Sequence, residues 1–147
     1  MADYGEIVKI ILKEADWNFS AKELEDATAF KLPMSAKNCP GLNVNMVIGS
    51  AGDVKLRCYL AEDVKESKRL DIIQVLNALN SQYRYVTLSI DDDGDVLAAY
   101  DFNLFNDEPD SVRFAIFSTM VLFTKVADKC IPPIMKAIWA GDDDDDD

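Results

Sequence analysis

The sequence offers residue types for few kinds of catalysis, because none of its 147 residues is a histidine. Histidine is the commonest general base and the usual partner of a serine or cysteine nucleophile, and it also supplies imidazole metal ligands. The chain contains neither the glycine-rich patterns that bind phosphates nor the GxSxG motif of many hydrolases. These observations predict a protein that is not an enzyme and that holds no cofactor.

The three cysteines are the remaining candidates for a nucleophile or a thiolate metal site. Cys39, Cys58 and Cys130 are odd in number, widely spaced and without a CxxC pair. This spacing indicates neither a disulfide framework nor a zinc site. We predict that all three are ordinary packing residues, as free cysteines commonly are.

The acidic run at residues 91–95 is the best candidate for a cation site. Calcium prefers several hard oxygen ligands on a sharp turn, and this run offers three well-spaced carboxylates: Asp91, Asp93 and Asp95. In the calcium-loop register with Gly94 at the turn, however, Tyr100 stands where the bidentate glutamate belongs. The pattern favours an ordinary hairpin turn, with a weak cation site as the alternative.

A candidate surface for binding a protein or peptide comes from the outward positions of predicted strands. Lys55, Arg57 and Tyr59 alternate with apolar residues, and Tyr85 takes an outward position on another predicted strand. Tyrosine and arginine are enriched in protein interfaces. If the two strands are neighbours, these four side chains form one amphipathic surface; a plain solvated sheet face is the alternative.

The helices and strands that must position these residues are predicted most clearly between residues 70 and 105. Apolar residues spaced by one, three and four predict an amphipathic helix that ends near Tyr83. The period then changes to two, which predicts strands at residues 85–90 and 96–104. The acidic run lies between them, so this region predicts a helix followed by an antiparallel hairpin.

The rest of the chain supplies further helices and strands by the same patterns. We expect a helix at residues 4–15, a short turn capped by Ser20, and an edge strand at 27–34, where Pro33 lacks a donor. A hairpin at residues 42–60 follows, and a last helix begins at Asp110 or Ser111 and is interrupted at residues 132–133 by two prolines. The predicted order is α-β-β-β-α-β-β-α, an α+β fold whose antiparallel sheet packs against helices.

The last helix is apolar on two sides. One stripe consists of Val112, Ile116, Met120, Phe123, Ala127 and Cys130, and the second set consists of Phe114, Phe117 and Val121. One side can cover the sheet, so the other must meet the first helix or a second subunit. The second set is therefore a candidate for helix packing or for a homodimer interface.

The charge balance constrains the partners. The net charge is −12, of which six acids form the terminal run 142–147; without them 21 acids face 15 bases, a balance of −6. An acidic surface repels phosphate backbones, so we expect no nucleic-acid binding.

No signal peptide is apparent and the longest uncharged apolar stretch, residues 114–124, is too short to cross a membrane. We expect a cytoplasmic protein with a single domain at residues 1–141 and a disordered acidic tail.

The run VLNALNSQYRYVTLSIDDDGDVLAAYDFNL resembles the YbjN family of bacterial proteins. The residues that carry the match are Leu76, Asn77, Leu79, Asn80, Leu88, Asp91, Asp93, Gly94, Leu97 and Tyr100. The resemblance implies a fold similar to the small acidic chaperones of type III secretion, commonly dimeric, which bind other proteins and catalyse nothing. The family label is sensory transduction regulator.

Our leading expectation is a non-enzymatic bacterial module that binds another protein, chaperone-like or regulatory in signal transduction, and acts as a homodimer. One alternative is a sensing module that binds a ligand or a cation at the Asp91–Asp95 turn. Another is an acidic inhibitor or immunity-type protein with a basic partner, whose binding salt would weaken.

Overall fold

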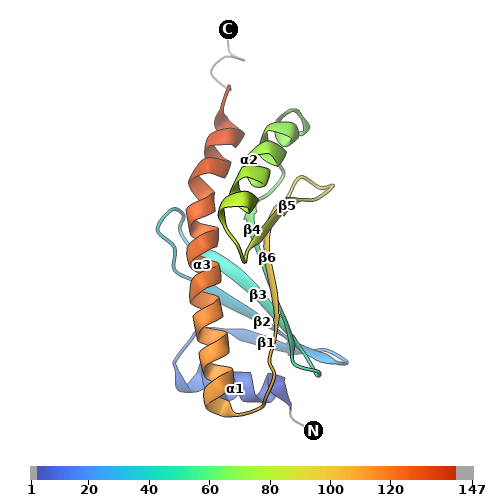
Figure 1. The fold of residues 1–147 in the computed structure, drawn as a ribbon, viewed down its shortest axis with the longest axis vertical. Helices are drawn as coiled ribbons and strands as arrows, with labels where there is room; N and C mark the ends of the chain where they lie inside the picture. The colour runs from blue at the N-terminus through green and yellow to red at the C-terminus, as the bar shows by residue number, and fades with distance from the viewer. Residues whose placement is uncertain (1–2, 142–147) are drawn as a thin grey trace.

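The computed structural model describes residues 3–141, and its main feature is a six-stranded antiparallel sheet (Figure 1). In space the strands follow the order β1-β2-β3-β4-β6-β5. Their bounds are β1 Ser20–Glu23, β2 Ala27–Met34, β3 Leu42–Gly49, β4 Asp53–Ala61, β5 Thr87–Ile90 and β6 Val96–Asn103. All neighbouring strands except β4 and β6 follow one another in the chain as hairpins. The pairing of β4 with β6 therefore joins the first four strands to the last two.

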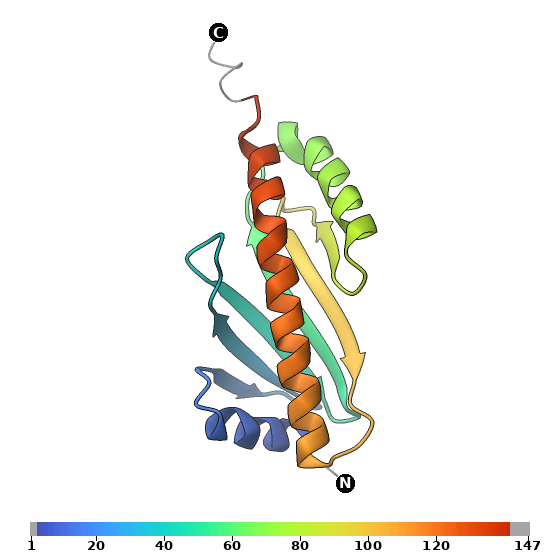
Figure 2. The same ribbon diagram turned by 60° about the vertical axis from the view of Figure 1, so that its left-hand side comes forward.

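Helices cover one face of this sheet. They are α1 Tyr4–Glu14, α2 Arg69–Gln82, preceded by the short 3₁₀ turn η1 Glu66–Lys68, and the long α3 Pro109–Trp139. Figures 1 and 2 show α3 running the length of the molecule, with α1 beside its beginning and α2 beside its end. Within residues 3–141, the other face of the sheet carries no helix in either view.

The core lies between the sheet and the helices and follows the alternation of the strands. The inward side chains of the sheet include Phe30, Leu32, Val44, Met46, Ile48, Val54, Leu56, Cys58, Val96 and Ala98, which are all buried. From α3, the whole predicted stripe is buried against them: Val112, Ile116, Met120, Phe123, Ala127 and Cys130. Burial of apolar side chains on this scale is the main favourable contribution to folding.

The α+β fold and the predicted element order are confirmed, with one additional strand. Residues Ser20–Glu23 form β1, where the sequence favoured a turn capped by Ser20. All four residues of β1 are exposed, so no alternation of apolar and polar residues reveals the strand. The prediction of an edge strand at 27–34 is therefore wrong for most of β2, because β1 takes the edge. β1 pairs only with residues 28–31, so Pro33 lies where β2 has β3 as its single neighbour and its missing donor breaks no pairing there.

The predicted interruption at Pro132 and Pro133 is wrong, because α3 continues through both prolines. In a helix, proline at 132 leaves the carbonyl of Asp128 without its usual donor four residues later. The side-chain amide of Asn38 donates to this carbonyl at 3.1 Å. A long-range hydrogen bond thus satisfies the group that Pro132 leaves free.

The last helix also begins earlier than predicted. It starts at Pro109, with Glu108 rather than Asp110 or Ser111 at the N-cap. Proline suits the first turn because the missing N–H has no helical partner there. The terminal residues 142–147 lie outside the part of the chain that is described, so the predicted disorder of the acidic tail stays a prediction. Among residues 3–141, no helix is both long and apolar enough to span a bilayer.

Candidate functional surfaces

The helix-free face of the sheet gathers three of the four predicted partner-binding residues. Lys55, Arg57 and Tyr59 alternate along β4 with the buried residues Val54, Leu56, Cys58 and Leu60, so all three point away from the helices. Arg57 forms an ion pair with Asp101 on β6, with Nη1 2.5 Å from Oδ1. The pair orients the guanidinium across two strands. We call Lys55, Arg57 and Tyr59 the open sheet face.

Tyr85 lies close to the open sheet face. It lines a shallow hollow with Asp101, the residue that forms an ion pair with Arg57. It precedes β5, which begins at Thr87, and its ring lies 6.0 Å from that of Tyr100. Tyr59 pairs with Leu97, whose partner on β5 is Ser89, so Tyr59 and Tyr85 are at different ends of this strand. The sequence placed Tyr85 on a strand whose regular pairing begins two residues later.

The outer side of α3 is only partly covered. Phe114 and Val121 are 76% and 56% exposed, whereas the ring of Phe117 stacks on Trp17 with centroids 4.8 Å apart. The connection between α1 and β1 thus covers the middle of the predicted second stripe. The two ends of the stripe remain exposed to solvent.

The acidic turn brings three carboxylates together, and two of their oxygens accept hydrogen bonds from backbone N–H groups. Ligand atoms of Asp91, Asp93 and Asp95 lie within 4.8 Å of one another. Asp91 Oδ1 accepts hydrogen bonds from the backbone N–H groups of Asp93 and Asp95, at 3.0 and 2.9 Å. Asp95 Oδ1 accepts from the N–H of Asp63 at 3.0 Å.

The same turn fixes the connection that leads into α2. The N–H of Val64 donates to the carbonyl of Gly94 at 2.9 Å, and Arg69 Nη1 donates to the carbonyl of Asp92 at 3.1 Å. Gly94 has a φ of +83°, and a Cβ there would lie 2.8 Å from the carbonyl oxygen of Val64. Only glycine fits this position without strain. The turn therefore has a structural role at the start of the helix.

The resemblance residue Asn80 connects α2 to the edge of the sheet. Its Nδ2 donates to the carbonyl of Leu88 at 3.0 Å, and its Oδ1 accepts from the N–H of Leu88 at 2.7 Å. The amide thus bonds both backbone groups of one residue on the edge strand β5, as a neighbouring strand would.

Two of the cysteines are chemically protected by the core. Cys58 and Cys130 are fully buried, and burial raises the pKa of each thiol to about 11. At neutral pH both remain protonated thiols, and a thiol is a weak nucleophile and a weak metal ligand. Their location agrees with the predicted packing role.

The clamp around Asp128 was not predicted from the sequence. This aspartate is buried on α3, and its Oδ1 and Oδ2 accept the backbone N–H groups of Asn38 and Lys37, at 2.9 and 3.1 Å. It fixes the loop after β2 to the middle of α3. Pro132 could have indicated that the Asp128 carbonyl needs a donor from outside the helix. The sequence does not show that Asn38 is this donor, because only the tertiary structure brings the two residues together.

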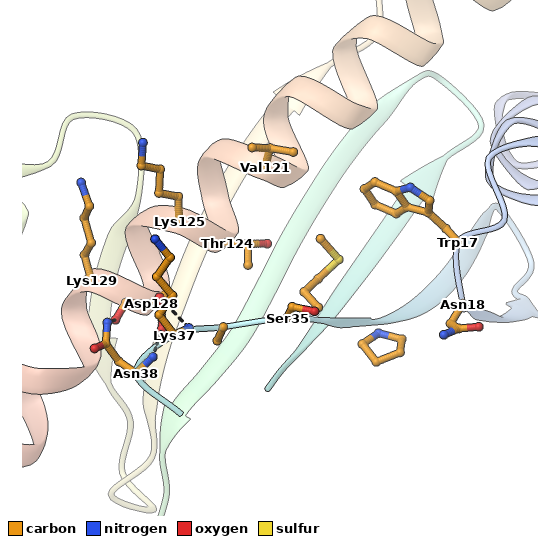
Figure 3. A pocket seen from close by; sticks show the side chains of 13 residues that line it. Trp17, Asn18, Ser35, Lys37, Asn38, Val121, Thr124, Lys125, Asp128 and Lys129 are labelled. Atoms are coloured by element: carbon orange, nitrogen blue, oxygen red, sulfur yellow. Dashed lines mark hydrogen bonds between the residues drawn. The ribbon is translucent and has the colours of Figure 1, made fainter. Parts of the chain in front are cut away.

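Beside this clamp lies a cavity of about 770 Å³, which no sequence pattern indicated. α3 forms one wall, the end of β2 and the following loop form another, and Trp17 closes one end (Figure 3). We call it the α3–β2 cavity. Its volume is in the range of sites for small ligands.

These features define an α+β protein with an antiparallel sheet covered by helices on one side and a second face free for contacts. A family model described as "YbjN: Putative bacterial sensory transduction regulator" matches residues 5–122. The chain therefore belongs to the YbjN family, which confirms the resemblance seen in the sequence.

A solved structure shares the fold. It is the "Crystal structure of YbjN, a putative transcription regulator from E. coli", with 16% sequence identity and a TM-score of 0.52. The match covers 95% of this chain and 92% of that chain. None of the curated proteins compared with this sequence matches it significantly.

Proposed function

We propose that the protein is a non-enzymatic regulatory module that acts by binding another protein through its open sheet face. The observation that carries the proposal is the helix-free face, which presents Lys55, Arg57 and Tyr59 together. Membership of a family described as a sensory transduction regulator supports a regulatory role. The predicted cytoplasmic location and the single unit at residues 1–141 are parts of the same proposal.

The chemistry of this face suits a protein partner. Tyr59 is 47% exposed, and a tyrosine contributes a large contact area with little loss of side-chain freedom. Arg57 is held by Asp101 before any partner arrives, which lowers the entropy lost on binding. Lys55 adds a second positive charge beside it. Such a face favours a partner with exposed apolar and acidic side chains.

We further propose that the protein acts as a homodimer through the outer side of α3. The exposed Phe114 and Val121 support this proposal, because a second copy of the helix would remove both from water. A dimer formed on this side leaves the open sheet face free. The chaperone-like mode of binding implied by the family resemblance stays a prediction.

Affinity capture with matched variants tests the proposed function. The tagged protein is used to capture partners from a lysate of its source, and Tyr59→Ala combined with Lys55→Ala should reduce the captured partner by about tenfold or more. Leu70→Ala is the matched control, because it removes an exposed apolar side chain from α2, on the helix-covered side of the sheet, and its capture should equal that of the wild type.

Further arms of the experiment separate the alternatives. Equal loss in the control and the double variant, or no loss in the folded double variant, would refute the assignment of the surface. A partner that is basic and is released at moderate salt would favour the inhibitor-type function. Capture that disappears with a calcium chelator would favour cation sensing, which the proximity of Asp91, Asp93 and Asp95 supports.

A further inference from the structure

The α3–β2 cavity has an apolar body with a fixed aromatic wall. Trp17, Pro33, Met34 and Val121 line it, and Trp17 is held in place by its stack on Phe117. A wall that is already ordered loses little entropy when a ligand binds. This part of the cavity suits an apolar group of modest size.

A buried hydroxyl without a partner lies in the wall of this cavity. Thr124 is only 7% exposed, and within residues 3–141 its Oγ1 is the one buried side-chain nitrogen or oxygen with no hydrogen bond. Figure 3 shows Thr124 on the α3 side, with Trp17 across the cavity from it. An unpaired buried hydroxyl is unfavourable, and a ligand that accepts its hydrogen bond would remove this cost.

The charged groups around the cavity are complementary to an anion. Lys37, Lys125 and Lys129 line it and gather toward the end that holds Asp128 (Figure 3). Asp128 is the only acidic residue that lines it, and both of its carboxylate oxygens already accept backbone N–H groups. Three lysines at one cavity are a local excess of positive charge on a protein with a net charge of −12.

We propose that the α3–β2 cavity binds a small amphipathic carboxylate. Its apolar body lies against Trp17 and Met34, and its carboxylate accepts a hydrogen bond from Thr124 Oγ1 and is neutralised by Lys37 and Lys125. The cavity is on the helix-covered side of the sheet, so this site goes beyond the proposed function and does not depend on the open sheet face.

The fluorescence of Trp17 provides a direct assay. The chain has two tryptophans, and Trp139→Phe leaves Trp17 as the only one in the full-length protein. Phenylbutyrate is the probe, and phenylbutanol is the matched neutral molecule with the same apolar body. We expect a saturable change in Trp17 emission with phenylbutyrate and about tenfold weaker binding of phenylbutanol.

Substitutions on α3 and its loop identify the groups responsible. Thr124→Val keeps the volume, removes the hydroxyl and should weaken phenylbutyrate binding about tenfold. It should leave the thermal midpoint unchanged or raise it, because the lost hydroxyl had no partner. Lys37→Met with Lys125→Met should abolish the preference for phenylbutyrate over phenylbutanol. Thr119→Val and Lys136→Met, on the same helix but away from the cavity, are the matched controls and should bind as the parent does.

Several outcomes would overturn the proposal. No saturation with phenylbutyrate, equal affinity for phenylbutanol, or unchanged binding in both the Thr124 and the lysine variants would each do so. Val121 also belongs to the proposed dimer side, so the titration is repeated at two protein concentrations with the oligomeric state measured. Trp17 emission that depends on protein concentration alone would assign the cavity to a second copy of the chain instead.

Discussion

At the scale of single residues, burial determines the chemistry of the cysteines. Cys58 and Cys130 have no exposed surface, whereas Cys39 is partly exposed in the loop after β2. The sequence predicted a packing role for all three, because free cysteines are commonly buried. Their different exposure depends on which elements cover them, and no pattern in the sequence indicates it.

We predict that one cysteine thiol reacts quickly with an alkylating reagent and that the other two react slowly. In the native protein at neutral pH, an alkylating reagent should modify Cys39 first, and Cys58 and Cys130 should react at full rate only after denaturation. Mass spectrometry of the alkylated peptides measures the order. Modification of all three at the same rate in the folded protein would contradict the burial of the two core thiols.

The raised pKa of the buried thiols also predicts a pH dependence of stability. Each folded-state pKa, at about 11, is above the ordinary value of 9.0, so the native state holds these protons more tightly than the unfolded chain. Their contribution is complete below pH 9.0 and is lost as the pH rises towards about 11. Urea unfolding across this range should show a smaller loss of stability in Cys58→Ala with Cys130→Ala than in the wild type. An equal loss would assign the pH dependence to other groups.

The candidate site was predictable where a regular pattern was enough. The period of two placed Lys55, Arg57 and Tyr59 on one face correctly, because alternation fixes the direction of side chains within a strand. It began the strand of Tyr85 two residues too early, because the pairing of β5 begins only at Thr87. Nothing in the sequence singled out Thr124. Whether a buried hydroxyl finds a hydrogen-bond partner depends on the residues that fold around it.

At the scale of elements, the continuity of α3 depends on a distant loop. Pro132 removes the donor to the Asp128 carbonyl, and the Asn38 amide replaces it across 90 residues of sequence. The same loop donates two backbone N–H groups to the Asp128 carboxylate. The local rule that proline ends a helix was overridden by tertiary hydrogen bonds.

This replacement predicts energetic coupling between Asn38 and Pro132. In the Pro132→Ala background, the restored helical N–H can donate to the Asp128 carbonyl, so Asn38→Ala should cost about 1 kcal/mol less than in the wild type. Urea unfolding of the two single variants and the double variant measures the coupling. Lys37→Ala is a suitable control, because its contact with Asp128 is made by the backbone. An equal cost of Asn38→Ala in both backgrounds would show that the amide does not replace the helical donor.

At the scale of the whole molecule, the exposed side of α3 raises the question of assembly. The sequence showed that the helix is apolar on two sides, and the structure leaves Phe114 and Val121 exposed after α1 and its connection are in place. An isolated exposed apolar residue is common, but Phe114 and Val121 lie two turns apart on one side of the helix, with the partly covered Phe117 between them, and this arrangement favours an interface. The homodimer is proposed on this basis.

We predict that Phe114→Asp converts a dimer into a monomer. Light scattering with size-exclusion chromatography should give about twice the chain mass of 16.4 kDa for the wild type and the mass of one chain for the variant. Phe105→Asp is the matched control, because Phe105 is 92% exposed and lies outside α3. The stability of both variants should change little, since the side chains are largely in water already. A wild-type monomer at high concentration, or equal dissociation by the control, would refute the interface.

The sequence was enough to predict the α+β class, the element order except for β1, and the buried stripe of α3, because local periodicity reports which side of an element meets the core. It also determined the lack of histidine chemistry. Three features depended on the tertiary structure: α3 passes through two prolines, Asn80 bonds the edge strand β5, and Thr124 lines a cavity rimmed by lysines. These features arise from contacts between separate elements of the fold, which no local pattern encodes.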